Sequence, residues 1–129
     1  MERKIRSFTD VKAWQSGHKL VLEIYKIVAL FPKDELFALT SQMKRSSASV
    51  TANIAEGFGR QGYKEKIKFY YISQGSLTEL KDQLLIAKAL GYISKTEFDS
   101  VAKLANTTHK LLIGLIKKSK EFLNQESNI

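Results

Sequence analysis

Apolar and small residues recur along most of this chain at alternating intervals of three and four. The clearest run lies between residues 63 and 90, where such residues occupy positions 70, 73, 77, 80, 84 and 87. Similar runs lie within residues 10–30, 34–57 and 95–120, and no stretch of useful length alternates at every second residue. Alternating threes and fours place one seam along each helix and favour left-handed, nearly antiparallel packing. The pattern predicts an all-α protein, an antiparallel up-down-up-down four-helix bundle.

Turn-forming residues divide the chain at three places. The single proline, Pro32, follows the first run, glycines crowd residues 57–62, and Gly91 follows the third run. Short connections between long helical segments are typical of bundles. We therefore predict one domain over residues 1–129, with helices at about 10–30, 34–57, 63–90 and 95–120.

Several helix ends carry capping signals. Gly57 is expected to end the second helix in a left-handed conformation, and Ser94 with Glu97 has the spacing of a capping box for the fourth. The apolar pattern is lost from about residue 117, so we expect the last turns of the chain to fray.

Composition excludes several classes of site. The 129 residues contain no cysteine, which excludes disulfides, thiolate nucleophiles and cysteine-ligated metal sites. The first residues are charged, and no apolar run approaches the roughly 18 residues that span a bilayer. We therefore expect a cytoplasmic protein without a secretory signal or a membrane partner.

A net charge of +8, from 21 basic and 13 acidic residues, favours a polyanionic partner. The surplus is spread along the chain, so the fold must assemble any anion-binding surface. The candidate residues for phosphate contacts are Lys44, Arg60, Lys64, Lys66 and Lys68. Lysines on a helix can equally form a solvated face with no ligand, and this alternative stays open.

Apparent catalytic and nucleotide-binding motifs fail on their context. Residues 57–62 spell G-x-G-x-x-G, but a helix precedes them where the dinucleotide fingerprint needs a strand. His18 and His109 are the only histidines, and neither belongs to a Glu-x-x-His pair. No nucleophile and base can be paired, so we expect no enzyme activity, no cofactor and no metal.

The second predicted helix carries polar residues to which we assign a structural role. Residues 46–53 are mostly small, which allows close packing inside one bundle or, alternatively, a contact between subunits. Asn53 and Glu56 share a face, and Glu56 should accept hydrogen bonds from a backbone or basic group because it lies at the negative end of the helix dipole. Folding the second and third helices into a hairpin makes an ion pair between Arg45 and Glu79 plausible, with Gln42 and Gln83 one turn further out.

A longer set of residues has a recognisable order. It comprises Phe8, Trp14-Gln15, Ile24-Tyr25, Phe31-Pro32-x-x-Glu35-x-Phe37-x-Leu39-Thr40, Gln42-x-x-Arg45, Ser49-Val50, Asn53-Ile-Ala-Glu-Gly57, Gly59-Arg60, Gly75-Ser76-Leu77-x-Glu79-Leu80 and Leu90-Gly-Tyr-Ile-Ser94. These residues resemble the bacterial four-helix bundle proteins encoded in 23S rRNA intervening sequences, the S23 family. The resemblance covers roughly residues 8–118.

The resemblance implies assembly into a ring-shaped homopentamer. A relative of that family, the accessory variability protein of diversity-generating retroelements, is a basic pentamer that binds nucleic acid and a reverse transcriptase. Charge and resemblance together favour a non-enzymatic, oligomeric bundle that binds RNA or DNA through phosphate contacts. The alternative is a protein-interaction scaffold for an acidic partner such as a reverse transcriptase, with no direct role in nucleic-acid binding.

Overall fold

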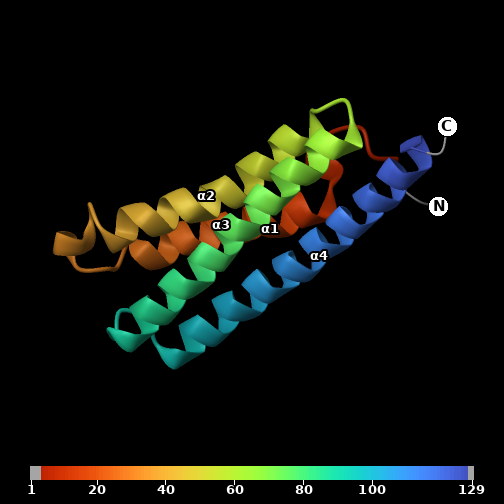
Figure 1. Cartoon of the computed structure of the whole chain (residues 1–129). Coiled ribbons are helices and arrows are strands. Elements are labelled where there is room, and N and C mark those ends of the chain that lie inside the picture. Colours follow the sequence, from red (N-terminus) through yellow and green to blue (C-terminus); the bar gives the residue numbers. More distant parts are fainter. Residues whose placement is uncertain (1–3, 128–129) are drawn as a thin grey trace.

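The computed structural model describes residues 4–127, which form helices and short connections (Figure 1). Its four long helices are α1 (Lys12–Val28), α2 (Leu39–Phe58), α3 (Tyr63–Ala89) and α4 (Lys95–Ser127). Two short 3-10 helices, η1 (Phe8–Asp10) and η2 (Lys33–Glu35), precede α1 and α2. The described part of the chain contains no strand, which confirms the predicted all-α class.

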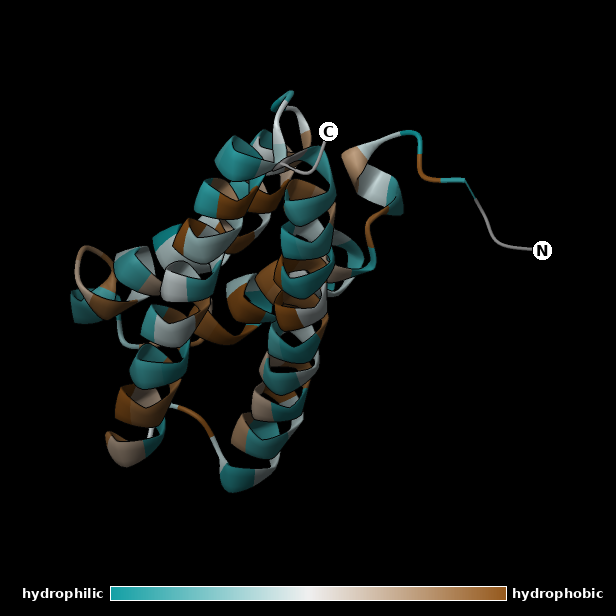
Figure 2. Cartoon of the chain, turned by 45° about the vertical axis from the view of Figure 1, so that its right-hand side comes forward, coloured by the Kyte–Doolittle hydropathy of each residue, from teal (hydrophilic) through white to brown (hydrophobic). Residues whose placement is uncertain are grey.

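Each long helix packs against two others. α1 and α3 both contact α2 and α4, so the four helices enclose a common core, and consecutive helices run in opposite directions in Figure 1. All six seam positions predicted between residues 70 and 87 are buried. Figure 2 shows hydrophobic and hydrophilic residues alternating around each helix. Burial of one large aliphatic side chain contributes about 1.5–3 kcal/mol, so this seam supplies much of the stability.

Hydroxyl groups in the core are hydrogen-bonded. Ser73 Oγ donates to the Val50 carbonyl at 2.7 Å, and Ser46 Oγ donates to Gln83 Oε1 at 2.7 Å. The small residues of α2 therefore pack against α3 of the same chain. Ala52, on the outward side of α2, is exposed and leaves a second small face uncovered in the monomer.

Both ends of α2 differ from the prediction. Gly57 lies inside α2 and is not left-handed; among the described residues the only positive φ is at Gly91, 77°. α2 begins at Leu39 and not near 34, because the chain first forms η2 and then turns at Ala38 (φ −120°, ψ −107°). Ser94 and Glu97 form the predicted capping box, with reciprocal bonds of 2.9 and 3.1 Å.

α4 continues to Ser127, so the prediction of fraying from about residue 117 is wrong. Ser119 is buried and donates to the Leu115 carbonyl at 2.7 Å. The Phe122 ring lies 5.1 Å from the ring of Tyr63 at the start of α3. These contacts hold the last turns even though their apolar intervals are irregular. Within the described residues, no helix is both long and apolar enough to cross a membrane.

Candidate nucleic-acid interface

Lys66, one of the predicted phosphate contacts, is already bonded to carbonyl oxygens of its own chain. Its Nζ donates to the Phe58 carbonyl at 2.6 Å and lies 3.5 Å from the Gly57 carbonyl. The last carbonyls of a helix lack partners within the helix and carry the negative end of its dipole, so this cation stabilises the C-terminus of α2. Burial lowers the pKa of Lys66. Lys66 is therefore poorly placed to contact a ligand.

Arg60 is also already paired, in this case with two glutamates. Its guanidinium lies 3.1 Å from Glu56 Oε1 and 3.7 Å from Glu65 Oε2, and it lies over the Phe69 ring at 4.6 Å. Glu56 thus has a basic partner at the end of α2. Two carboxylates next to one arginine leave little positive potential at this position.

The remaining predicted cations lie in two places. Lys44 of α2 lies over the Tyr25 ring of α1 at 5.1 Å. Lys64 and Lys68 are exposed at the start of α3 and form no ion pair within the described chain. The structure therefore does not gather the five predicted residues into one patch.

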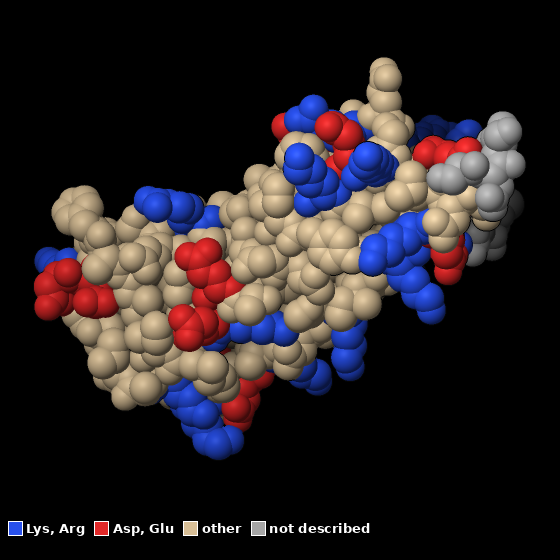
Figure 3. All heavy atoms as spheres, in the orientation of Figure 1, with Lys and Arg blue, Asp and Glu red and all other residues tan. Residues whose placement is uncertain are grey.

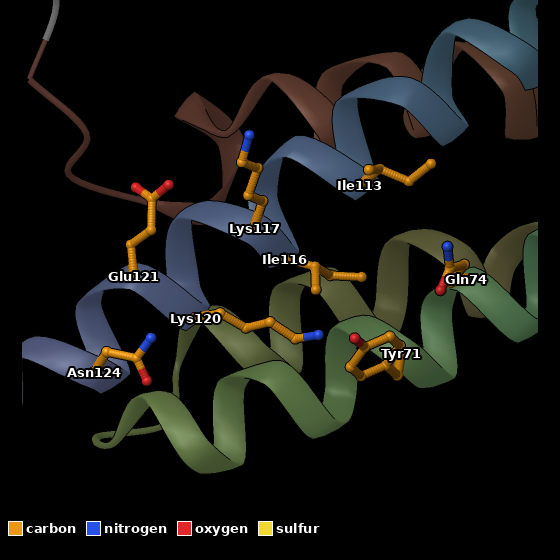
Figure 4. Close-up of a pocket in the computed structure, with 8 residues that line it drawn as sticks. All are labelled: Tyr71, Gln74, Ile113, Ile116, Lys117, Lys120, Glu121 and Asn124. Atoms are coloured by element: carbon orange, nitrogen blue, oxygen red, sulfur yellow. The ribbon is translucent and has the colours of Figure 1, made fainter. Parts of the chain in front are cut away.

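Two lysines of α4 that were not predicted lie at a groove between α4 and α3; in Figure 4 Lys120 points toward α3 and Lys117 points away from it. Lys117 and Lys120 line a groove between the two helices, of about 390 Å³, together with apolar and amide side chains (Figure 4). Its full lining is Tyr71, Gln74, Ile113, Ile116, Lys117, Lys120, Glu121 and Asn124. These two lysines were not predicted as ligand contacts because they fall in the segment expected to fray.

Within the groove, Lys120 reaches from α4 toward Tyr71 of α3, as Figure 4 shows. Its Nζ lies 5.1 Å from the centre of the Tyr71 ring. Lys68 lies one turn before Tyr71 on α3, and Lys64 one turn earlier, so both share a helix face with Tyr71 just outside the groove lining. Lys64, Lys68, Lys117 and Lys120, hereafter the groove lysines, form no ion pair within the described chain.

The net charge is unevenly divided along the bundle axis. Side-chain bonds between Ser16 and Thr108 (2.7 Å) and between Ser49 and Ser76 (2.8 Å) mark the middle of the bundle. The half made of residues 4–17, 50–75 and 108–126, hereafter the basic half, has eleven basic and five acidic residues. The other half, residues 18–49 and 76–107, has nine basic and seven acidic residues. Figure 3 shows basic side chains around the α2–α3 turn and along the C-terminal half of α4, both in the basic half.

The predicted polar network of α2 and α3 forms only in part. Asn53 Nδ2 donates to the Ser49 carbonyl at 2.8 Å. Arg45 and Gln42 are exposed, and no ion pair joins Arg45 to Glu79 in the part of the chain described, so that predicted pair is wrong.

The register also differs from the prediction, because Ser46 bonds to Gln83 and Ser49 to Ser76, so Gln83 lies opposite Ser46 and not opposite Gln42. Glu79 instead accepts a hydrogen bond from Gln83 Nε2, at 3.3 Å, within its own helix.

His109 forms a separate polar group between α3 and α4. Its Nδ1 lies 2.7 Å from Lys81 Nζ, and its Nε2 lies 3.2 Å from the Gln74 amide. An ammonium can only donate, so Nδ1 accepts and the ring proton is on Nε2; this tautomer requires the Gln74 side-chain amide to turn its oxygen, and not its nitrogen, toward Nε2. Desolvation, and to a lesser degree the charge of Lys81, lowers the pKa of His109. Within residues 4–127 no three His, Asp or Glu side chains are grouped to hold a metal ion.

Fold and surface together define a small four-helix bundle with a basic half and an open groove between α3 and α4. A model of the 23S rRNA-intervening sequence protein family matches residues 9–114, and the chain belongs to that family. A solved structure of a protein of unknown function from the S23 ribosomal protein family of Bacteroides thetaiotaomicron VPI-5482 is similar, with a TM-score of 0.76 and 23% identity. The similarity covers 81% of this chain and 95% of that one, and it supports the fold. No curated protein matches the chain.

Proposed function

We propose that this protein is a non-enzymatic, cytoplasmic, self-associating bundle that binds RNA or DNA through phosphate contacts at its basic half. The observation that carries the proposal is the charge division, because the basic half holds a surplus of six positive charges and the other half only two. The groove lysines lie in the basic half without carboxylate partners. Phosphate contacts by lysine are salt-dependent and carry little sequence information.

Self-association is supported by exposed apolar side chains at the opposite end of the bundle. Phe37 is 91% exposed and Leu30 is 81% exposed, both in the connection between α1 and α2. Leu36 in the same connection and Leu90 at the end of α3 are also about half exposed. Monomers rarely expose such a group of large apolar residues without a partner. We propose that this end contacts further copies of the chain, in a pentamer as the family resemblance implies.

Assembly would repeat the basic half in every subunit. A polyanion longer than one subunit could then contact several copies, and linked weak contacts raise the overall affinity without any new contact. This arrangement would make a modest patch of lysines sufficient for useful binding.

The test is a fluorescence-anisotropy titration of the assembled protein against labelled rRNA fragments, unrelated RNA and DNA across a salt series. We expect binding to all three that weakens steeply as salt rises. No binding at low salt by a folded oligomer would contradict the proposal. That result would favour the alternative, a scaffold for an acidic protein partner such as a reverse transcriptase.

A further inference from the structure

The groove between α3 and α4 has features that phosphate binding alone does not require. Phosphate contacts need exposed cations, whereas this groove also has an apolar floor, with Ile116 buried and Ile113 half exposed. Tyr71 forms one wall and is 44% exposed. The amide side chains of Gln74 and Asn124 complete the lining, and Glu121 is the one acid in it.

We infer that this groove binds the bases of a single-stranded nucleic acid, with a base stacked on Tyr71 and the neighbouring phosphates on the groove lysines. The inference rests on the proposed function and specifies its ligand. Proteins that bind single strands combine a basic groove with aromatic side chains on which bases stack, and this groove has both. A duplex keeps its bases paired and stacked, so it would reach only the lysines at the groove edge.

Lys120 is placed to serve both parts of the ligand. Its ammonium covers the Tyr71 ring at 5.1 Å in the free protein. An exposed cation–π contact is weaker than the stacking of a base on an aromatic ring, so a base can displace it. The displaced ammonium remains next to the ring, where the phosphate of the stacked nucleotide lies. Lys68 and Lys64, which lie one and two turns before Tyr71 on α3, would contact the next phosphates.

The molecule provides a matched control for Tyr71. Tyr25 on α1 is 45% exposed, and Lys44 lies over its ring at the same distance of 5.1 Å. This pair lies in the half with the small charge surplus, where Tyr25 lines a separate hollow on α1 with Lys19, Leu22, Glu23 and Lys26. Tyr71→Ala and Tyr25→Ala therefore remove equivalent contacts from the protein, and only the first removes the proposed stacking surface.

The experiment measures anisotropy binding of three probes of equal length: a single-stranded oligonucleotide, its duplex, and an abasic strand with the same phosphates. The proteins are the full chain and its Tyr71→Ala, Tyr71→Phe and Tyr25→Ala variants, with circular dichroism and thermal melts to verify folding. We expect the parent to prefer the base-carrying single strand over the abasic strand by about tenfold. Tyr71→Ala should abolish that preference, whereas Tyr71→Phe and Tyr25→Ala should keep it.

Other outcomes overturn the inference and locate the failure. Equal binding of all three probes, unaffected by Tyr71→Ala, would leave phosphate binding in place and exclude a base site in the groove. An equal loss of affinity for all three probes in Tyr71→Ala would show that the tyrosine acts on the lysines or the fold and does not stack a base. Absence of binding to any probe at low salt would overturn the inference together with the proposed function.

Discussion

Gly57 of α2 faces the Tyr70 ring of α3 so closely that a β-carbon at Gly57 would lie 2.7 Å from Tyr70 Cε1. The same atom would lie 3.0 Å from the β-carbon of Phe69. Distances this short require the two helices to separate or the tyrosine to turn. The glycine is therefore needed for close packing of α2 on α3, and not for a left-handed turn.

Gly57→Ala should accordingly destabilise the protein, by about 1–3 kcal/mol, the usual cost of overpacking a core. The matched control is Gly75→Ala, also in a helix but with nothing within 4 Å of the added carbon. That change should stabilise by roughly 0.5–1 kcal/mol, because alanine restricts the unfolded chain. Urea unfolding of both variants checks the pair, and a Gly57→Ala variant as stable as the parent would contradict the packing account.

The buried bond between Ser16 and Thr108 predicts unequal effects of removing each side. Thr108 Oγ1 already donates to the Leu104 carbonyl at 2.9 Å, so Ser16 must be the donor in the 2.7 Å bond between the hydroxyls. Thr108→Val leaves the buried Ser16 donor unpaired and should cost about 1–3 kcal/mol.

Ser16→Ala leaves Thr108 bonded to Leu104, so its cost should be smaller. The double variant Ser16→Ala/Thr108→Val should be more stable than Thr108→Val alone, because no buried donor remains unpaired. Thermal or urea unfolding of the three variants measures these differences in stability. If the double variant is the least stable of the three, the assigned bond direction is wrong.

His109 predicts that stability falls as the pH drops below the usual histidine range. Its pKa in the folded protein lies below the ordinary value of 6.5, so in that window the unfolded chain binds a proton that the folded chain does not. The contribution is fully present above 6.5 and is lost as the pH falls below that value toward the lowered pKa. His109→Gln should flatten this part of the pH dependence of the urea midpoint.

The other histidine is the control for this experiment. His18 is exposed and stacks on Trp14, with ring centres 4.8 Å apart. His18→Gln removes a histidine that takes no part in the Lys81 contact, so it measures the effect of the same substitution elsewhere. If His109→Gln and the parent lose stability in parallel between about pH 7 and 5, the account of the Lys81–His109 contact is contradicted.

Phe37 provides a test of self-association that does not disturb the core. Because its side chain is 91% exposed, Phe37→Ser should change monomer stability by less than about 0.5 kcal/mol. If the α1–α2 connection contacts other copies, the variant should lose the oligomer seen by light scattering. Ile72→Ser, at a half-exposed position on α3 in the basic half, should keep it. A parent that is already monomeric, or a Phe37→Ser variant that assembles normally, would refute this interface.

The fold could be predicted because the information lies in local intervals. Residues spaced three and four apart share a helix face, and one buried seam per helix determines which faces meet. The ends of α2 and α4 could not be obtained in this way. The role of Gly57 depends on Tyr70 in the next helix, and the last turns of α4 are held by the contact of Phe122 with Tyr63, which no interval within α4 reveals.

The candidate site was less predictable because charge counts do not say which cations already have partners. Lys66 and Arg60 are close in sequence to Lys64 and Lys68. Lys66, however, is bonded to a carbonyl at the end of α2, and Arg60 is paired with two glutamates. Lys117 and Lys120 are about fifty residues further on and join Lys64 and Lys68 only through the packing of α3 on α4. A surface assembled from two helices requires knowledge of their register and of where the second helix ends.

The most direct test of the central claim neutralises two matched sets of four lysines and measures the salt dependence of binding to single-stranded RNA. One variant changes the groove lysines to glutamine; the other changes Lys19, Lys33, Lys88 and Lys103, exposed residues of the opposite half. The two variants carry the same net charge. The groove variant should lose most of its affinity, and its negative slope of log affinity against log salt should become less steep by roughly three. The opposite-half variant should change little, and equal losses in both variants, or no binding by the parent, would contradict the claim.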